Sequence, residues 1–213
     1  MNDTSIKILH LPLGPLETNC YVLACTQTNQ AAVIDPSWNG RFIADKAAEQ
    51  GWTISHILLT HSHFDHVGGL AELKNAAGAP IYLHPEAAPM LQGAALAARL
   101  WQIAIPEPPP PDEALAEGQI ITVGKLALEV LFTPGHAPGH VSFYLRAHNV
   151  LFDGDVLFQQ SIGRTDLPGG DFDLLMQVIR EKLLVLPDET AVLSGHGPAT
   201  TIGQEKRWNP FLQ

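Results

Sequence analysis

The densest group of chemically active side chains lies in the segment Thr60–His66, which reads T-H-S-H-F-D-H. Imidazole nitrogens and a carboxylate at this density are the donors of a transition-metal site. In an extended segment, residues two apart point the same way, so His61 and His63 would converge on one cation. Asp65 and His66 begin a helical pattern and would face a second point. The spacing therefore favours two neighbouring metal ions over a polar loop of surface histidines.

Further candidate ligands follow apolar runs later in the chain, each time beside a glycine. They lie in three segments, the first with Gly135-His136 and Gly139-His140, the second with Asp153-Gly154-Asp155 and the third with Gly195-His196. Glycine permits a tight turn that brings a ligand to the end of a strand without a side-chain clash. Together with Thr60–His66, this arrangement occurs four times along the chain. Its recurrence predicts one composite site at a single edge of a sheet.

Apolar periodicity predicts the elements that must hold these ligands. Strands are expected near 6–11, 19–25, 31–35, 56–60, 80–83, 119–123, 126–132, 141–146, 149–153 and 190–194, and helices at 40–50, 66–77, 86–104 and 171–183. Two strand groups, each with its own helices, indicate two packed sheets with helices outside. We expect a core helix over 86–104, followed by a stiff surface loop at the proline-rich run 106–112. The alternative is that the whole segment 86–112 forms a lid over the substrate.

Composition favours one enzyme-sized domain over residues 1–213, because 46% of its residues are hydrophobic and can form a substantial core. The net charge of −10, from 12 basic and 22 acidic residues, argues against a nucleic-acid partner. No apolar stretch approaches the roughly 20 residues that span a bilayer, and residues 1–7 lack the start of a signal peptide. Cys20 and Cys25 would occupy opposite faces of one strand and stay unpaired. We therefore expect a cytoplasmic protein without a membrane partner.

The order T-H-x-H-x-D-H, G-H, G-D, G-H resembles the metallo-β-lactamase superfamily. Within it, the chain is most similar to glyoxalase II, the hydroxyacylglutathione hydrolases, in the short bacterial form that lacks the C-terminal helical domain. The resemblance covers almost the whole chain, from Thr18-Asn19-Cys20-Tyr21 to Asn209-Pro210-Phe211-Leu212. It implies an α/β fold of the αββα metallo-β-lactamase type, with two mixed sheets and helices on the outer faces.

The resemblance also assigns ligands position by position. It makes His61, His63 and His136 the ligands of one metal, makes Asp65, His66 and His196 those of a second, and makes Asp155 the bridge between them. The implied cofactors are two divalent metals, with zinc the default for an imidazole-rich site and iron or manganese compatible with the same donors. Asp65 would also orient the water between the metals. The pattern leaves the roles of His84 and His140 open, between structural histidines and neighbours of the site.

A two-metal site fits a hydrolase that needs neither a serine nor a cysteine nucleophile, and the chain has no Gly-x-Ser-x-Gly motif. The resemblance implies hydrolysis of S-D-lactoylglutathione to D-lactate and glutathione through a metal-bridging hydroxide. The alternative is a persulfide dioxygenase, which would use one iron held by the positions of His61, His136 and Asp155. A non-catalytic binding module is disfavoured because all seven ligand positions are filled.

Substrate contacts are expected from cationic side chains, because glutathione is anionic. The candidates are Arg164, Lys206 and Arg207. Arg164 is expected to pair mainly with Asp166 and to fix the loop after Asp155. The expected partner is thus a small-molecule thioester, while the missing helical domain leaves the thiol carrier open. The sequence does not indicate an oligomeric state.

Overall fold

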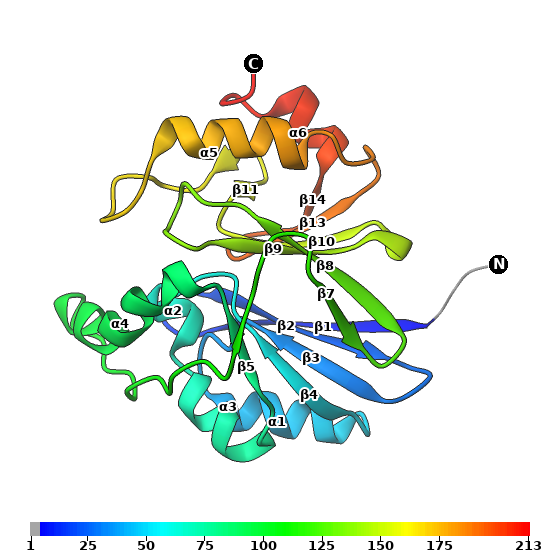
Figure 1. Ribbon diagram of the computed structural model, residues 1–213, viewed down its shortest axis with the longest axis vertical. Helices are drawn as coiled ribbons and strands as arrows, with labels where there is room; N and C mark the ends of the chain where they lie inside the picture. The colour runs from blue at the N-terminus through cyan, green and yellow to red at the C-terminus, as the bar shows by residue number, and fades with distance from the viewer. Residues whose placement is uncertain (1–4) are drawn as a thin grey trace.

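The computed structural model describes residues 5–213 and contains two six-stranded sheets packed face to face (Figure 1). The first sheet has the order β1-β2-β3-β4-β5-β6, with strands Ile6–Leu13, Thr18–Cys25, Gln30–Ile34, Thr53–Leu58, Ile81–Leu83 and Glu113–Ala114. The second has the order β14-β13-β10-β9-β8-β7, with strands Thr200–Thr201, Ala191–Ser194, Val150–Gly154, Val141–Leu145, Leu126–Phe132 and Ile120–Val123. Residues 1–4, part of the segment behind the cytoplasmic expectation, lie outside the described residues.

Helices cover the outer face of each sheet (Figure 1). Those beside the first sheet are α1 (Gly40–Glu49), α2 (Phe64–Val67), α3 (Leu70–Ala77) and α4 (Ala88–Leu100), and those beside the second are α5 (Phe172–Val178) and α6 (Ile202–Trp208). Both sheets mix parallel and antiparallel pairs, since β3 and β10 each have one neighbour of each kind. This arrangement confirms the αββα fold. Within residues 5–213, no helix is long and apolar enough to cross a membrane.

Short elements complete the chain between these layers. They are the 3₁₀ turns Pro85–Ala87 and Arg146–His148, the π-helical turn Ile179–Leu183 after α5, and a two-stranded ribbon of β11 (Leu157–Phe158) and β12 (Ser161–Ile162). The ribbon directly follows β10, so the chain leaving that strand turns back at once. This return places the loop that follows β12 close to the end of β10, where Gly163 donates a backbone hydrogen bond to Val156.

Three apolar layers hold the sandwich together, which is why both faces of each sheet are hydrophobic. Strand β2 shows the division, because all eight of its residues are buried. Cys20 belongs to the cluster between the first sheet and its helices, whereas Cys25 belongs to the cluster between the two sheets. A third cluster lies between the second sheet and α5. Both cysteines are free, as the opposite-face argument predicted.

The helix predicted over 66–77 is in fact two helices, because the pair Gly68 and Gly69 interrupts it. A Cβ atom at Gly68 would lie 2.6 Å from the carbonyl oxygen of Ser37, and one at Gly69 would lie 2.9 Å from the backbone nitrogen of Gly40. The backbone at Gly68 and Gly69 therefore packs closely against the backbone at Ser37 and Gly40, and α2 ends after one turn.

Helix α4 has the alanine- and leucine-rich composition of a strong helix former, with proline in its first turn, where no backbone donor is lost. It buries Leu91, Ala94 and Ala98 against the core. The loop after it is fixed by Asp112, whose carboxylate accepts the backbone N–H of Ile81. Helix α4 therefore packs one face on the core and is followed by an anchored surface loop, and the preference for this arrangement over a lid stays a prediction.

Candidate metal centre

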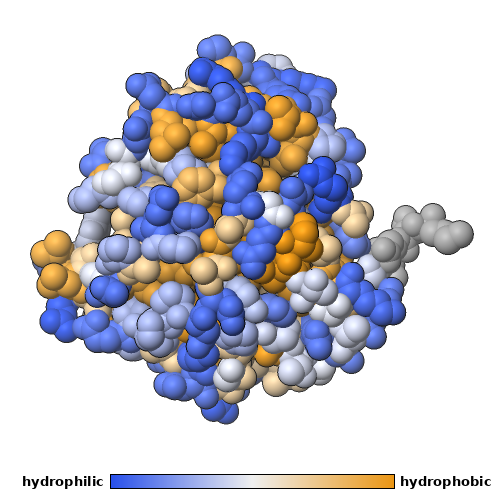
Figure 2. Space-filling view, in the orientation of Figure 1, coloured by the Kyte–Doolittle hydropathy of each residue, from blue (hydrophilic) through white to orange (hydrophobic). Residues whose placement is uncertain are grey.

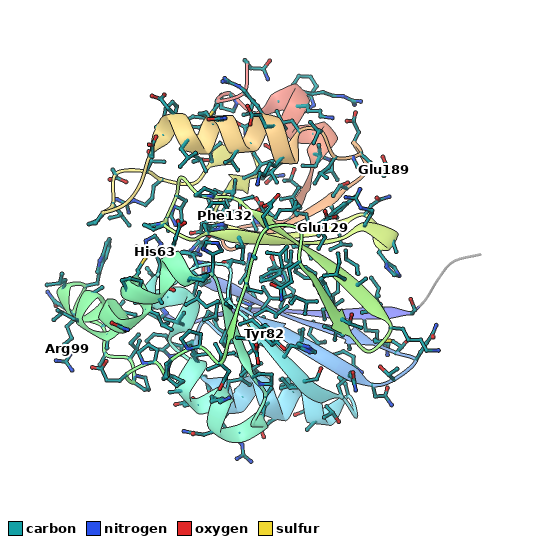
Figure 3. All side chains as sticks on the ribbon, in the orientation of Figure 1. His63, Tyr82, Arg99, Glu129, Phe132 and Glu189 are labelled. Carbon is teal, nitrogen blue, oxygen red and sulfur yellow. The ribbon has the colours of Figure 1, made fainter. Side chains whose placement is uncertain are left out.

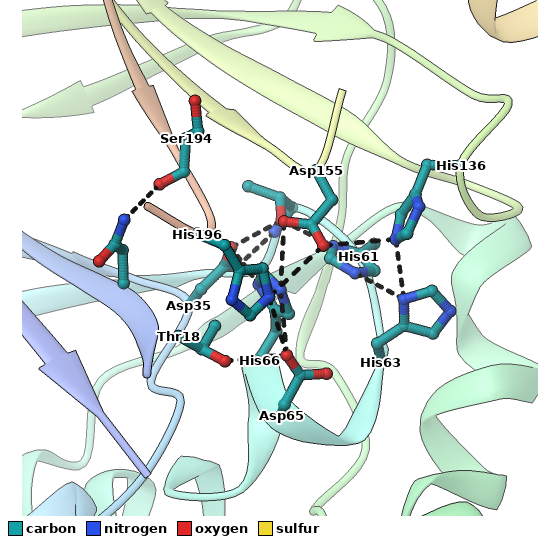
Figure 4. A network of polar contacts seen from close by, with 12 residues as sticks. Thr18, Asp35, His61, His63, Asp65, His66, His136, Asp155, Ser194 and His196 are labelled. Atoms are coloured by element: carbon teal, nitrogen blue, oxygen red, sulfur yellow. Dashed lines mark hydrogen bonds and ion pairs between the residues drawn. The ribbon is translucent and has the colours of Figure 1, made fainter. Parts of the chain in front are cut away.

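The candidate ligands meet at one edge of the sandwich, at the ends of strands from both sheets (Figure 4). Parallel pairing explains the convergence, because the carboxyl ends of parallel strands lie at the same edge. Asp155 follows β10 and His196 follows β13, which pair in parallel. The segment from His61 to His66 follows β4, whose last residue is Leu58 rather than the predicted Thr60. His136 comes from the turn between β8 and β9.

A first group consists of three imidazoles from His61, His63 and His136, whose ligand atoms lie within 4.8 Å of one another. Nδ1 of His63 is 3.0 Å from Nε2 of His61 and 2.9 Å from Nε2 of His136. His63 lies where the two halves of the sandwich meet (Figure 3). The three nitrogens expected to share a metal therefore face a common point.

A second group consists of Asp65, His66 and His196. Oδ2 of Asp65 lies 3.1 Å from Nε2 of His196 and 3.6 Å from Nε2 of His66. The hydroxyl of Thr18 donates a hydrogen bond of 2.8 Å to the same oxygen and so fixes the carboxylate. This group is richer in oxygen than the first, and it is formed by the short helix α2 and the turn after β13.

Asp155 lies between the two groups. Its Oδ2 is 3.5 Å from Nε2 of His136 in the first group, and its Oδ1 is 3.4 Å from Nε2 of His66 in the second. Glycines make room for this carboxylate: a Cβ atom at Gly195 would lie 2.1 Å from its Oδ1, and one at Gly163 would lie 2.0 Å from its backbone oxygen. Asp155 therefore faces both groups, at the position where the sequence predicts a bridging ligand.

The first group is electrically neutral near pH 7. Burial, together with the neighbouring imidazoles, lowers the pKa of His61 well below its ordinary value and that of His63 to about 4. Burial also lowers the pKa of His136. Unprotonated imidazole is the form that binds a metal, so these rings are ready to ligate without first losing a proton.

The second group carries balanced charge. Burial opposes protonation of His66, but the carboxylates of Asp155 and Asp65 outweigh burial and raise the pKa of this histidine well above its ordinary value. Burial also opposes ionisation of the two carboxyls, but His66 and the other nearby histidines together outweigh burial, so the pKa of Asp65 falls to about 2 and that of Asp155 falls further. The positive charge on the neighbouring histidines keeps both carboxylates ionised. A bound divalent cation would have the same effect.

One residue of the site that the sequence analysis missed is Asp35, which follows β3. Its Oδ2 accepts hydrogen bonds from the Thr60 hydroxyl at 2.7 Å and from Nδ1 of His66 at 3.0 Å. Because the Thr60 hydroxyl donates to Asp35, it accepts from Nδ1 of His61 at 3.0 Å. A single buried carboxylate thus fixes the tautomers of two rings and turns both Nε2 atoms toward the cluster.

A sequence signal for Asp35 was present. The residue follows the apolar run 31–34, as the other candidate ligands follow theirs, but it stands apart from any histidine. Strands β3 and β4 pair in parallel, so Asp35 and Thr60 emerge side by side. The backbone of Asp35 has φ 50°, in the left-handed region that residues other than glycine seldom occupy. The sharp turn explains how its carboxylate reaches Thr60.

His140 supports Asp155 from behind and is not a member of either group. Its Nε2 accepts the backbone N–H of Asp155 at 3.1 Å, which requires that the proton be on Nδ1, directed to the Thr133 hydroxyl at 2.9 Å. Asp153 is fully buried and accepts the backbone N–H of Leu157 at 2.7 Å, so it points away from the cluster. Of the two aspartates, only Asp155 faces the histidines. His84 stacks on Phe132, with ring centroids 4.5 Å apart.

The donor set fits metal ions on grounds internal to the structure. Nδ1 of His136 donates to the backbone oxygen of Arg164 at 2.8 Å, so Nε2 of both His136 and His61 present lone pairs to His63. His63 has at most one proton on Nδ1 and cannot satisfy both. In addition, Nε2 of His66 and Oδ1 of Asp155 are buried within the described chain without a hydrogen-bond partner. A cation would satisfy the lone pairs that meet at His63, and a cation that displaces the Nε2 proton of His66 would pair both that nitrogen and Asp155.

Of the three cationic residues suggested for substrate contact, one lies beside the cluster and two lie away from the cavities that open on it. Arg164 lies at the rim of the cluster and donates two hydrogen bonds to Asp166, at 2.7 and 2.8 Å, as predicted. Lys206 donates to Asp188 at 2.6 Å. Neither Lys206 nor Arg207 lines the cavities that open on the cluster. Their contact with a substrate stays a prediction.

Comparison with known proteins agrees with the fold and the cluster. The family model described as the metallo-beta-lactamase superfamily matches residues 13–196, so the chain belongs to that superfamily. It is 43% identical to the probable metallo-hydrolase YqgX of Bacillus subtilis, over 97% of this chain and 98% of the relative. It is 39% identical to the hydroxyacylglutathione hydrolase GloC of Haemophilus influenzae, over 95% and 96%.

Two solved structures show the same architecture over nearly the whole chain. The BLEG-1 B3 metallo-beta-lactamase has a TM-score of 0.91 and 44% identity, and it covers 97% of this chain and 100% of its own. TTHA1623 in a di-iron-bound form has a TM-score of 0.89 and 45% identity, over 96% and 100%. The chain is thus a member of a metallo-hydrolase superfamily with histidine and aspartate groups suited to metal.

Proposed function

We propose that this protein is a hydroxyacylglutathione hydrolase of the glyoxalase II type, a thioester hydrolase with two divalent metals per chain. The reaction would release D-lactate and glutathione from S-D-lactoylglutathione. The single observation that carries the proposal is the position of Asp155, between a three-histidine group and an Asp-His-His group. The similarity to GloC of Haemophilus influenzae supports the thioester class. A cytoplasmic location, where Cys20 and Cys25 stay reduced, belongs to the same proposal.

Seven side chains would hold the metals. His61, His63 and His136 suit the first ion, Asp65, His66 and His196 suit the second, and Asp155 suits both. Bound divalent cations would lower the pKa of a bound water to about 7 and polarise the carbonyl oxygen of a substrate. Zinc suits the imidazole-rich donors, and the di-iron form of TTHA1623 supports iron as an alternative.

The residues around the ions supply position and charge. Asp35 and Thr60 keep His61 and His66 in the ligating tautomer, and Thr18 holds Asp65 beside His196, where its carboxylate would orient the attacking water. A thiolate leaves readily because a free thiol has a pKa of about 8.5, so no strong acid is needed to protonate it. Within the described chain, neither cavity at the cluster is lined by a lysine, a tyrosine or a cysteine.

The test is thiol release from S-D-lactoylglutathione by protein loaded with zinc, iron or manganese. We expect turnover that falls by at least about 100-fold in Asp155→Ala and in His136→Ala, since even loss of a residue that only orients a ligand costs 10- to 100-fold. Asp45→Ala is the matched control, because Asp45 is exposed on α1, where it pairs with Arg41. Absence of turnover from protein that holds metal would contradict the proposal.

The same preparations separate the hydrolase from a persulfide dioxygenase. That enzyme would need one iron held by His61, His136 and Asp155, and it would consume dioxygen in the presence of glutathione persulfide. In the structure, His63 is almost equally close to His61 and to His136, so it belongs to the first group. Asp65, His66 and His196 form a second group. These contacts favour two ions. Dioxygen uptake without thioester cleavage would favour the dioxygenase.

A further inference from the structure

A cavity of about 570 Å³ opens directly on the metal cluster. One end is formed by ligand candidates, including His63, Asp65 and Asp155. The walls are apolar, and much of the lining comes from one face of α4. The apolar lining includes Leu16, Phe64, Met90, Ala97, Leu100 and Trp101. A volume of this size suits a small organic ligand, and an apolar wall with polar groups at one end fixes its orientation.

Charge in this cavity is a poor match for glutathione, which carries two carboxylates. The one cation that lines it within residues 5–213 is Arg164, and its guanidinium is bound through two hydrogen bonds to Asp166. Arg99 is also on α4, but it lies at the outer end of that helix, pointing away from the cluster, and is 4.0 Å from Glu107 (Figure 3). An anionic arm would find no unpaired cation along this wall.

The surface around the mouth is apolar as well. Leu100 is 81% exposed and Trp101 is 53% exposed, although both line the cavity. Figure 2 shows hydrophobic surface over the outer end of α4, where Leu96 and Leu100 are exposed. The ring of Trp101 stands 6.2 Å from that of Phe64, centroid to centroid. When an apolar ligand covers side chains that are exposed to water, the free energy of the system falls, which favours binding.

A second cavity of about 450 Å³ meets the cluster from another side. It shares His136, Asp155, Arg164 and His196 with the first, so the cluster lies at the junction of the two. Its remaining lining adds the polar side chains Gln159 and Ser161 to the apolar Phe158, Ile162 and Pro198. A substrate cleaved at the junction would place one arm in each cavity.

We propose that the preferred substrate carries an apolar arm, a medium-length alkyl chain or an aryl ring, that lies along α4 next to the scissile thioester. The other arm, small and uncharged or polar, would occupy the second cavity. This inference rests on the thioester hydrolysis proposed above, and it makes S-D-lactoylglutathione a substrate that is cleaved less efficiently than an apolar, uncharged thioester. The apolar arm can belong to the acyl part or to the thiol part of the thioester, because either part can carry an alkyl chain or an aryl ring.

Gly93 provides a clean way to fill the cavity. It is an α4 residue that lines the cavity, and a Cβ atom placed on it would meet nothing within 4 Å. Replacing a helical glycine by leucine also raises helix propensity, so Gly93→Leu should fold at least as well as the parent chain. The matched control is Gln92→Leu, which adds the same side chain to the exposed face of the same helix.

The experiment compares kcat/KM for two series with the metal-loaded protein. One series has straight-chain acyl groups from acetyl to decanoyl on N-acetylcysteamine, and the other has acetyl thioesters of straight-chain thiols. We expect kcat/KM to rise by about fourfold per methylene in one series until the cavity is full, the gain that burial of a methylene provides. The longest members should exceed S-D-lactoylglutathione. Gly93→Leu should remove the rise, and Gln92→Leu should retain it.

Three results would overturn the inference while leaving the hydrolase intact. They are rates independent of chain length in both series, a glutathione thioester preferred over every neutral one, or the same rise in Gly93→Leu as in the parent chain. Calorimetry with S-octyl-N-acetylcysteamine, an uncleavable thioether, gives a readout apart from turnover. Suppose that this thioether binds, that Gly93→Leu weakens its binding at least tenfold, and that no thioester is turned over. This result would support the apolar site and contradict the proposed function.

Discussion

At the scale of single residues, the arrangement depends on a buried carboxylate that is not among the seven expected ligands but contacts one of them. Asp35 orients His66 directly and His61 through the Thr60 hydroxyl, with contacts of 2.7 to 3.0 Å. Without it, Nδ1 of His66 would lose its acceptor, and either tautomer of that ring would become available. Second partners of this kind hold a ligand in the form that binds metal.

We predict that Asp35→Asn lowers metal affinity by about 10- to 100-fold while the fold is retained. Asparagine keeps the shape of the side chain but replaces one acceptor oxygen by a donor, which opposes the hydrogen bonds from Thr60 and His66. The measurement is the metal content of the protein after equilibrium dialysis against a metal buffer, with circular dichroism as the check of folding. Asp45→Asn is the control, and unchanged affinity in Asp35→Asn would refute the role.

At the scale of elements, glycine contacts decide where helices break. Gly40 begins α1, and a Cβ atom there would lie 2.1 Å from the backbone oxygen of Gly69. We predict that Gly40→Ala lowers the free energy of unfolding by about 1–3 kcal/mol, because backbone must move to admit the methyl group. Gly93→Ala should instead raise it by roughly 0.5–1 kcal/mol, since space is open and helix propensity improves. Urea denaturation measures both, and equal effects would contradict the packing argument.

Much of the site could be predicted because its ligands follow apolar runs in the sequence. His61, His136, Asp155 and His196 each come directly after or close to the end of a strand, and the structure brings them together as expected. Asp35 was missed because it is a lone aspartate in sequence, and only the parallel pairing of β3 with β4 brings it to Thr60.

The elements themselves were predicted less evenly. The expected helix over 40–50 matches α1, where Asn39 caps the first turn, but nothing in the pattern indicated α6. That helix is short, and it is held by tertiary contacts, since its buried Glu205 accepts from Thr200 and Asn209. The short strands β6 and β14 also depend on partners far away in sequence, which local periodicity cannot reveal.

At the scale of the whole molecule, the cluster joins the two halves of the sandwich. Asp35 and the segment from His61 to His66 belong to the first sheet, whereas His136, Asp155 and His196 belong to the second. A cation shared by these side chains would bind the folded chain and not the unfolded one. Metal therefore adds to stability according to its concentration relative to its dissociation constant.

We predict that removal of metal by a chelator lowers Tm and that its return restores it. Free metal at 100 times the dissociation constant would contribute about 2.7 kcal/mol per site, enough to shift Tm by several degrees in a chain of this length. Differential scanning calorimetry of the chelated and reloaded protein measures the shift. An identical Tm for protein with and without bound metal would show that the cluster does not hold an ion in the folded state.

The central claim is that two cations, held by seven side chains with Asp155 between them, cleave a thioester. The most direct measurement adds zinc, iron or manganese stepwise to the chelated protein and follows thioester hydrolysis at each step. We predict that turnover rises with added metal and reaches its plateau at two equivalents per chain, and that Asp155→Ala shows no such rise. Full turnover without metal, or a plateau at one equivalent, would contradict the account.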